Sequence, residues 1–336
     1  MTSRVKLLID CDPGIDDLMA LTYAVAHPQV DIVGAVASGG NVSTEQVGRN
    51  LRGALTLLEA EQVLWELGAQ NPLVKQLETT EETHGPLGTG YAELPQQQEP
   101  THKELGAGAR LWVDLANRYA EELDGVVLGP CTNLALALEL DPELPQKLRS
   151  LHIMGGALNH RGNTMPTTEW NIHSDPEAAH RVFQAFSQEN LPCYPVLCPL
   201  DQTEKMVMTT EKRRKLCAGN SPQLHAIDRA LQFYMEFHEW DNLGFIAHVH
   251  DPYVVALAIN ESLCRTGEPS AVMLGESTST VIDVELDGKL TRGQTIADWL
   301  GRWDRNDNAR ALTGADAEKF FDHYISTVRN RFAPSH

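Results

Sequence analysis

Short apolar runs alternate with amphipathic stretches along most of the chain, and this order limits the fold more than any other feature. Such an alternation is typical of parallel strands that are joined by helical crossovers. The expected strands are residues 5–9, 32–36, 63–67, 126–128, 150–154 and 194–197. The expected helices begin near Asp16, Thr44, Ala107, Asn133, Pro176, Pro222 and Pro252. The sequence therefore predicts an α/β fold with an open, mostly parallel, Rossmann-like sheet that is flanked by helices.

The C-terminal part of the chain has a different pattern. Residues 281–286 alternate between apolar and polar side chains, and residues 290–296 are suited to be a returning strand. Asp287-Gly288, which lies between them, suits a type I′ turn. We therefore expect a β-hairpin appended to the sheet, followed by a final helix over residues 315–329.

Three Asp-Pro pairs each precede a helical pattern. They are Asp141-Pro142, Asp175-Pro176 and Asp251-Pro252. An aspartate that caps a helix, followed by proline at the first helical position, has this form. The local pattern alone therefore predicts a helix cap at all three pairs.

No linker or internal repeat divides the sequence, so residues 1–336 are predicted to form one domain. Residues 75–104 are polar and rich in Gly, Pro, Gln and Thr, as mobile lids over binding sites often are. Residues 236–250 carry a high density of aromatic and histidine side chains. We expect lid segments at residues 75–104 and 204–248, although a solvated loop is the simpler explanation of the first.

Charge and cysteine content limit the partners and the compartment. The formal net charge of −19 argues against binding to nucleic acid or to anionic membranes, which requires clustered Lys and Arg. A small uncharged or cationic ligand is expected instead. The six cysteines show no CxxC spacing, and the N-terminal residues show no signal-peptide pattern. These features predict a cytoplasmic protein.

Four carboxylates, Asp10, Asp12, Asp16 and Asp17, lie within eight residues, directly after an apolar run and at the start of a helical one. Carboxylates that are held close together either take up protons or bind a hard cation through their oxygens. Acids in the first turn of a helix are also stabilised by the helix dipole, but such a role uses only one or two of them. The cluster therefore predicts a metal site at the carboxyl end of the first strand, where open parallel sheets bind ligands.

Polar and glycine residues follow the other predicted strands. They are residues 38–41, 129–133 and 154–156, with Asn163 and residues 169–171 further along the chain. Glycine permits close approach of the backbone to a ligand, and Asn and Glu side chains pair with hydroxyl groups. These residues are suited to a polyhydroxylated ligand such as a sugar.

An ordered set of motifs resembles the inosine-uridine preferring nucleoside hydrolase family. The motifs are residues 10–17, Gly40-Asn41, residues 154–156, Glu169-Trp170-Asn171, residues 175–180 and residues 250–252. The resemblance spans nearly the whole chain, and the first motif is highly specific. It implies hydrolysis of the N-glycosidic bond of purine or pyrimidine ribonucleosides to free base and ribose, with bound Ca²⁺, in a homodimer or homotetramer.

The same resemblance implies which residues act on the metal and on water. It places on the metal the carboxylates of Asp12, Asp17 and Asp251 and the backbone carbonyl of Leu128. Asp12 would also take the proton from the attacking water, with Asn41 near that water. Asp10 would support the acidic cluster.

The substrate contacts follow from the resemblance as well. Asp16 and Asn171 would hold the 2′ and 3′ hydroxyls of the ribose, and Asn163 and Glu169 the 5′ hydroxyl. The groups expected by the base are His84, Trp170, Met154 and His250. His250 is the candidate acid for the leaving base, because imidazole titrates near neutral pH.

Two other functions fit part of the pattern. Asp10-Cys11-Asp12 after a strand is similar to the nucleophile and acid of haloacid dehalogenase-type phosphohydrolases, but such enzymes need neither Asp16-Asp17 nor the Asn and Glu set. A catalytically silent nucleoside- or ribose-binding protein would keep the metal and ribose contacts without turnover. Release of phosphate from nucleotides, or failure to release ribose from any nucleoside, would identify these alternatives.

Overall fold

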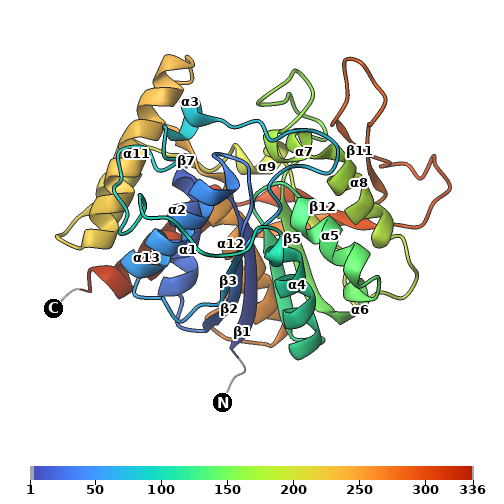
Figure 1. Ribbon diagram of the computed structural model, residues 1–336, viewed down its shortest axis with the longest axis horizontal. Helices are drawn as coiled ribbons and strands as arrows, with labels where there is room; N and C mark the ends of the chain where they lie inside the picture. Colours follow the sequence, from blue (N-terminus) through green and yellow to red (C-terminus); the bar gives the residue numbers. More distant parts are fainter. Residues whose placement is uncertain (1–3, 335–336) are drawn as a thin grey trace.

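A central sheet of eight strands organises residues 4–334, the part of the chain that the computed structural model describes (Figure 1). Its strands in spatial order are β3 (Trp65–Leu67), β2 (Val30–Ala37), β1 (Val5–Cys11), β4 (Leu123–Val127), β5 (Leu148–Met154), β6 (Val196–Cys198), β12 (Ala309–Ala315) and β9 (Gly275–Thr280). Neighbouring strands are parallel except for β12 and β9, which are antiparallel. The predicted α/β fold with an open, mostly parallel sheet is confirmed.

Helices cover both faces of this sheet (Figure 1). One face carries α1 (Ile15–Ala26), α2 (Thr44–Leu57), α11 (Pro222–Trp240), α12 (His250–Arg265) and α13 (Ala317–Phe332). The other carries α4 (Ala107–Arg118), α5 (Thr132–Leu140) and α8 (Pro176–Ala185). Shorter helices are α3 (Glu81–His84), α6 (Leu144–Lys147), α7 (Trp170–Ser174), α9 (Leu200–Thr203) and α10 (Thr210–Cys217).

The side chains of β1 show why two layers of helices are needed. Leu7 and Ile9 are buried in the core beneath α1 and α12, whereas Leu8 is buried in the core beneath α4 and α5. Successive residues of a strand point to opposite faces, so a strand with consecutive apolar residues, such as Leu7, Leu8 and Ile9, must be covered on both sides. The first expected element of the sequence therefore already requires the three-layer arrangement.

All six predicted strands are present, and each predicted helix start lies within two residues of an observed one. The final helix begins at Ala317 rather than 315, because Asp316 caps it by accepting from the Lys319 N–H at 3.0 Å. Within residues 4–334, no helix combines the length and apolar character that crossing a membrane requires. Residues 1–3, part of the segment in which we expected no signal peptide, lie outside the described residues.

The predicted C-terminal hairpin is present as an antiparallel pair of strands, but its turn differs from the prediction and it does not join the central sheet. Its strands, β10 (Ile282–Val284) and β11 (Thr295–Ala297), are joined by residues 285–294 and form a separate sheet beside α8. Glu285 Oε1 accepts from the N–H groups of Asp287 and Gly288, at 2.8 and 3.0 Å, and thereby holds a wider loop. Gly288 does not adopt the positive φ that a type I′ turn requires.

Only one of the three predicted Asp-Pro caps is present. Asp175 caps α8 by accepting from the Ala178 N–H at 3.1 Å. Asp141 lies at the C-terminal end of α5, and Asp251 lies inside the first turn of α12. Since Val249 occupies the cap position of α12, the Asp251 carboxylate is available for another role.

The two predicted lid segments both contain well-anchored structure. In residues 75–104, the buried Gln97 Nε2 donates to Asn50 Oδ1 and to Thr89 Oγ1, each at 2.8 Å. Residues 204–248 contain α10, α11 and the small sheet of β7 (Val207–Met208) and β8 (Ala247–His248), and α11 packs on α1 and α3. Their mobility, and the single domain over residues 1–336, stay predictions.

Acid is expected to destabilise the protein through His27, a buried residue at the end of α1. Burial, and then nearby His323, lower the pKa of His27 from 6.5 to about 4. The folded protein therefore binds fewer protons than the unfolded chain between these values, so stability is full above pH 6.5 and falls as the pH decreases. We expect a loss on the order of 2 kcal/mol from this residue by pH 4.

The measurement is urea unfolding at pH 7 and pH 4.5. His27→Gln should lose less stability between the two pH values than the wild-type protein. His225→Gln, at an exposed position of α11, is the control and should lose as much as wild type. Equal losses for His27→Gln and wild type would refute the assignment.

Candidate active site

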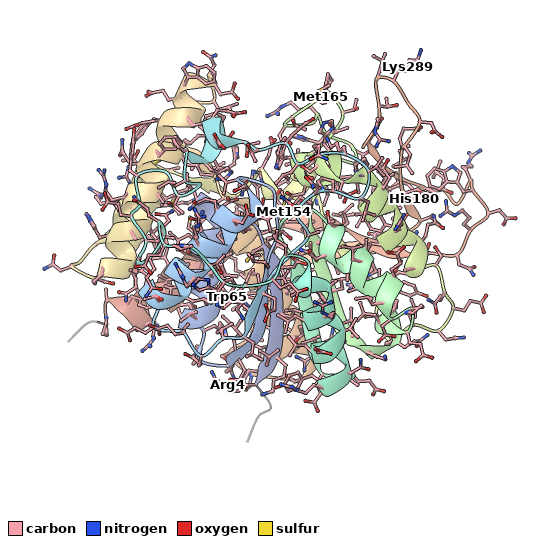
Figure 2. All side chains as sticks on the ribbon, viewed as in Figure 1. Arg4, Trp65, Met154, Met165, His180 and Lys289 are labelled. Carbon is pink, nitrogen blue, oxygen red and sulfur yellow. The ribbon has the colours of Figure 1, made fainter. Side chains whose placement is uncertain are left out.

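A cavity of ≈ 450 Å³ opens beyond the carboxyl ends of the strands. Its walls include Asp12, which follows β1, Asn41, which follows β2, and Met154, the last residue of β5. Figure 2 shows Met154 near the centre of the molecule, at the ends of the strands. The volume lies in the range of about 300–1,000 Å³ that is typical of small-molecule sites.

Buried carboxylates form the floor of this cavity. Oxygens of Asp16, Asp17 and Asp251 all lie within 4.8 Å of one another. Asp12 is joined to the group through its backbone, because its N–H donates to Asp17 Oδ1 at 3.2 Å. Asp17 Oδ2 also accepts from the Gly14 N–H at 3.0 Å, which fixes the start of α1. Residues from β1, α1 and α12 therefore meet at one point, as the sequence predicted.

The carboxylates of this floor resist ionisation in the absence of a cation. Burial, followed by repulsion from Asp17, raises the pKa of Asp12 well above 3.8 and that of Asp16 to about 7. Burial, followed by repulsion from Asp16, raises the pKa of Asp251 in the same way. Within residues 4–334, no Lys or Arg forms an ion pair with these acids.

This donor set fits a hard divalent cation. All of its groups are oxygens, and the cavity wall also includes Leu128, whose carbonyl follows β4 directly. Such cations prefer carboxylate and carbonyl oxygens. A positive ion would replace the missing basic partners and lower the mutual repulsion. The group of carboxylates whose oxygens lie within 4.8 Å of one another contains Asp16, whereas the sequence analysis placed Asp12 on the metal. The side chains of Asp12 and Asp16 both face the cavity.

Asp10 is held apart from the other acids. Its carboxylate accepts from Ser38 Oγ at 2.6 Å, Trp112 Nε1 at 2.8 Å and Asn133 Nδ2 at 3.1 Å. Burial raises its pKa to about 6, although these three hydrogen bonds favour the ionised form. Asp10 therefore ties β1 to β2, α4 and α5 below the cavity rather than lining it.

Asn41 fixes the orientation of Asp12. The Asn41 N–H donates to Asp12 Oδ2 at 2.9 Å, and its side-chain Nδ2 donates to the Asp12 carbonyl at 3.0 Å. A Cβ on Gly40 would lie 2.1 Å from Asp12 Oδ2, so only glycine leaves room for this carboxylate. The Gly40-Asn41 motif thus has two roles: the glycine leaves room for the Asp12 carboxylate, and the asparagine holds that carboxylate by hydrogen bonds.

The polar wall is built around Glu169, which caps α7. Its carboxylate accepts from the N–H groups of Asn171, Ile172 and Gly156 at 2.8, 3.0 and 2.9 Å. Asn171 Nδ2 donates to the Leu128 carbonyl at 2.6 Å, and Asn163 Oδ1 accepts from the Trp170 N–H at 2.9 Å. The predicted hydroxyl-binding residues therefore lie on one rigid wall beside the acids.

Imidazole rings line the opposite part of the cavity. His84 Nδ1 accepts from the Ile15 N–H at 3.1 Å, and His250 Nδ1 lies 2.9 Å from Thr203 Oγ1. Burial lowers the pKa of His84 to about 3 and that of His250 well below 6.5. Both rings are therefore neutral at neutral pH in the ligand-free protein.

Comparison with known proteins identifies the family. The family model described as "Inosine-uridine preferring nucleoside hydrolase" matches residues 7–322. The chain belongs to this family. It is accordingly a hydrolase that acts on N-glycosyl compounds, which confirms the predicted enzyme class and leaves the phosphohydrolase alternative without support.

Individual nucleoside hydrolases are similar over nearly their whole length. A pyrimidine-specific ribonucleoside hydrolase, RihA of Shigella boydii serotype 4 (strain Sb227), is 34% identical over 320 residues, which are 95% of this chain and 96% of the relative. A purine-preferring ribonucleoside hydrolase from Gardnerella vaginalis has a TM-score of 0.86 at 26% identity, covering 98% and 100% of the two chains. A plant nucleoside hydrolase, PpNRh1, has a TM-score of 0.82 at 26% identity, covering 98% and 99%.

Most residues that the sequence singled out meet in this nucleoside hydrolase site. The cavity wall contains every predicted site residue except Asp10 and Asp17, which lie behind it. The sequence analysis missed Thr203, Tyr234 and His248 as parts of the site. The aromatic and histidine density of residues 236–250, which include His238, was the available signal for His248, whereas nothing in the sequence marks Thr203.

Proposed function

We propose that this nucleoside hydrolase cleaves ribonucleosides, pyrimidine ribonucleosides among them, to free base and ribose with calcium as its metal. The supporting observation is the cavity in which buried acids from β1, α1 and α12 face the polar wall of α7. The inclusion of pyrimidine ribonucleosides is supported by the 34% identity to a relative named as pyrimidine-specific. The metal would be held by the carboxylates of Asp12, Asp17 and Asp251 and by the Leu128 carbonyl.

Bound calcium would lower the pKa of the attacking water and orient it, so that a modest base is enough. Asp12 accepts the proton of that water, and Asn41 keeps the Asp12 carboxylate aimed at it through the 2.9 Å bond. Asp10 supports this arrangement from below through its bonds to the neighbouring strands.

Ribose is bound by groups whose free hydrogen-bonding capacity matches hydroxyls. Asp16 and Asn171 hold the 2′ and 3′ hydroxyls, and Asn163 and Glu169 hold the 5′ hydroxyl. Glu169 is oriented by three backbone N–H groups, so its carboxylate is fixed before the substrate arrives. The carboxylates around the sugar stabilise the oxocarbenium-like transition state electrostatically.

The base departs between His84, Trp170, Met154 and His250, which line the cavity. His250 serves as the acid that delivers a proton to the leaving base, and Thr203 orients its ring through the 2.9 Å contact at Nδ1. Since burial lowers the pKa of His250 in the ligand-free site, this role requires that His250 take up its proton after the substrate has entered.

His250→Ala is expected to lower kcat for natural nucleosides by about 10²–10⁴-fold, because general acid catalysis contributes that much. The measurement is kcat for uridine and for 4-nitrophenyl ribofuranoside, whose leaving group needs no proton. The loss should be much smaller for the nitrophenyl substrate, and calcium should still bind. Equal losses for both substrates would show that His250 does not act as the acid.

The proposed function is tested by a panel of inosine, uridine, cytidine and adenosine, assayed for reducing sugar with and without a calcium chelator. Release of ribose that is lost on chelation and restored by calcium is the expected result. Binding of nucleosides without any release of ribose would instead identify the silent nucleoside-binding protein.

We further propose a cytoplasmic homodimer or homotetramer. The cytoplasmic location is supported by the cysteines, since all six are free and four of them are buried. Sedimentation analysis of the purified protein would determine the subunit number.

A further inference from the structure

Two histidines that the proposed function leaves unused, His238 and His248, face the base end of the cavity. His238 comes from the last turn of α11 and His248 from β8. Their ring centroids lie 5.3 Å apart, and the His248 ring lies 6.2 Å from that of His250. His238 is only 5% exposed and packs edge-on against Tyr234, with ring centroids 4.6 Å apart. The two imidazoles therefore form a fixed wall beside the proposed acid.

The backbone determines which nitrogen of each ring carries the proton. His238 Nδ1 lies 2.8 Å from the Tyr234 carbonyl, and His248 Nδ1 lies 2.7 Å from the Glu204 carbonyl. A carbonyl oxygen only accepts hydrogen bonds, so each Nδ1 must carry a hydrogen and donate it. A neutral imidazole has one N–H group, and each Nε2 therefore keeps a free lone pair.

Both rings stay neutral in this setting. Burial lowers the pKa of His238 to about 4 and also lowers that of His248. Within residues 4–334, neither Nε2 has a protein hydrogen-bond partner. His84 has the opposite arrangement, because its Nδ1 accepts from the Ile15 N–H and its Nε2 carries the hydrogen. The wall thus offers two acceptors at His238 and His248 and one donor at His84.

We propose that His238 and His248 are specificity-determining residues, which select nucleobases that present an N–H donor on the edge remote from the glycosidic bond by accepting that hydrogen at Nε2. This inference rests on the proposed function. The 4-amino group of cytosine, N3–H of uracil and N1–H of hypoxanthine are donors of this class. A base with a lone pair or a C–H group at that edge would displace water from these two acceptors without replacing its hydrogen bonds, which weakens the binding of the transition state.

The test compares cytidine with its 4-deamino analogue, the riboside of 2-pyrimidinone. The analogue lacks the exocyclic amino group and adds no bulk, so steric exclusion does not affect the comparison. The quantity measured is the ratio of kcat/KM for cytidine to kcat/KM for the analogue, in the calcium-loaded full-length protein. The intrinsic reactivity of the two glycosidic bonds is the same for every variant, so it cancels when ratios are compared between variants.

His238→Phe/His248→Phe keeps two planar rings and removes both acceptors. We expect its ratio to be about 10–100-fold lower than that of the wild-type protein, which corresponds to the loss of one or two hydrogen bonds. His225→Phe is the matched control, since His225 is exposed on the same helix α11, and it should keep the wild-type ratio. An unchanged ratio in the double variant would overturn the inference.

A second measurement needs no substitution at either histidine, in case the double variant does not fold. The ¹⁵N shifts of labelled histidines are recorded in Asp12→Asn with and without cytidine. Nε2 of His238 or His248 should shift from the value of a free lone pair to that of a hydrogen-bonded nitrogen, and the deamino analogue should cause no such shift. Absence of the shift with bound cytidine would overturn the inference.

The two proposals fail in different ways. If the wild-type protein releases ribose from no nucleoside, the proposed function fails. If ribose is released but the ratio is unchanged in the double variant, only the present inference fails. For a protein that hydrolyses only purine nucleosides, inosine and purine riboside form the equivalent pair, and the same outcomes apply.

Discussion

Asp12→Asn is expected to lower kcat for nucleoside hydrolysis by at least about 10³-fold while ribose still binds within about tenfold of its wild-type affinity. Asparagine has the shape of aspartate, and its carbonyl oxygen still accepts from the Asn41 N–H, which lies 2.9 Å from Asp12 Oδ2. The amide cannot take a proton from water, so the loss falls on turnover rather than on binding. Steady-state kinetics and calorimetric titration with ribose provide the two measurements.

Asp287→Asn is the matched control for this variant, because Asp287 is exposed in the connection between β10 and β11. It carries the same chemical change far from the cavity and should keep wild-type kcat. If Asp12→Asn retained kcat within tenfold of wild type, another group would have to take the proton from water.

Asp17→Ala is expected to abolish calcium binding and, with it, activity. The Asp17 carboxylate lies with those of Asp16 and Asp251, all within 4.8 Å, so its removal takes away a ligand of the proposed metal. In the wild-type protein, calcium at 100 times its dissociation constant should raise Tm by roughly 3–5 °C. The variant should show no calcium-dependent rise in differential scanning calorimetry.

Asp17 also fixes the start of α1 through its 3.0 Å bond from the Gly14 N–H, and loss of such a bond costs about 1 kcal/mol by itself. Asp17→Asn separates the two effects, since its side-chain oxygen still accepts from Gly14 but the side chain carries no charge, and only the 3.2 Å bond from the Asp12 N–H is lost. It should lose less metal-free stability than Asp17→Ala and show a weakened calcium response. A full calcium-dependent rise in Asp17→Ala would exclude Asp17 as a ligand.

The parallel part of the sheet could be predicted because its strands are buried on both faces and therefore contain continuous apolar runs, as at residues 7–9 of β1 and 32–37 of β2. The antiparallel edge of the sheet could not be predicted. Residues 275–280 of β9 read GESTST, a mostly exposed polar strand, and such a segment has no apolar pattern that distinguishes it from a loop. The prediction of a type I′ turn at Asp287-Gly288 was wrong because the Glu285 side chain accepts hydrogen bonds from both residues, and the sequence preference for such turns takes no account of neighbouring side chains.

The site was predictable where short motifs follow strands, because strand ends in a parallel sheet converge on one edge. Asp12, Asn41 and Leu128 meet there for that reason. Contacts that depend on helix packing were not predictable: Thr203 reaches His250 only because α9 lies beside the start of α12. The proton positions on His238 and His248 depend on backbone carbonyls at residues 234 and 204, and no sequence pattern shows them.

The acids that meet under the cavity come from distant parts of the polypeptide, since Asp251 follows Asp12 by about 240 residues. Ribosomes add about 5–20 residues per second, so the first carboxylates emerge roughly 10–50 s before the last one. A nascent chain therefore has no complete set of metal ligands until α12 has been synthesised and folded onto β1. Proteins translated from mRNA that is truncated before α12 would lack Asp251, and added calcium would not restore their activity.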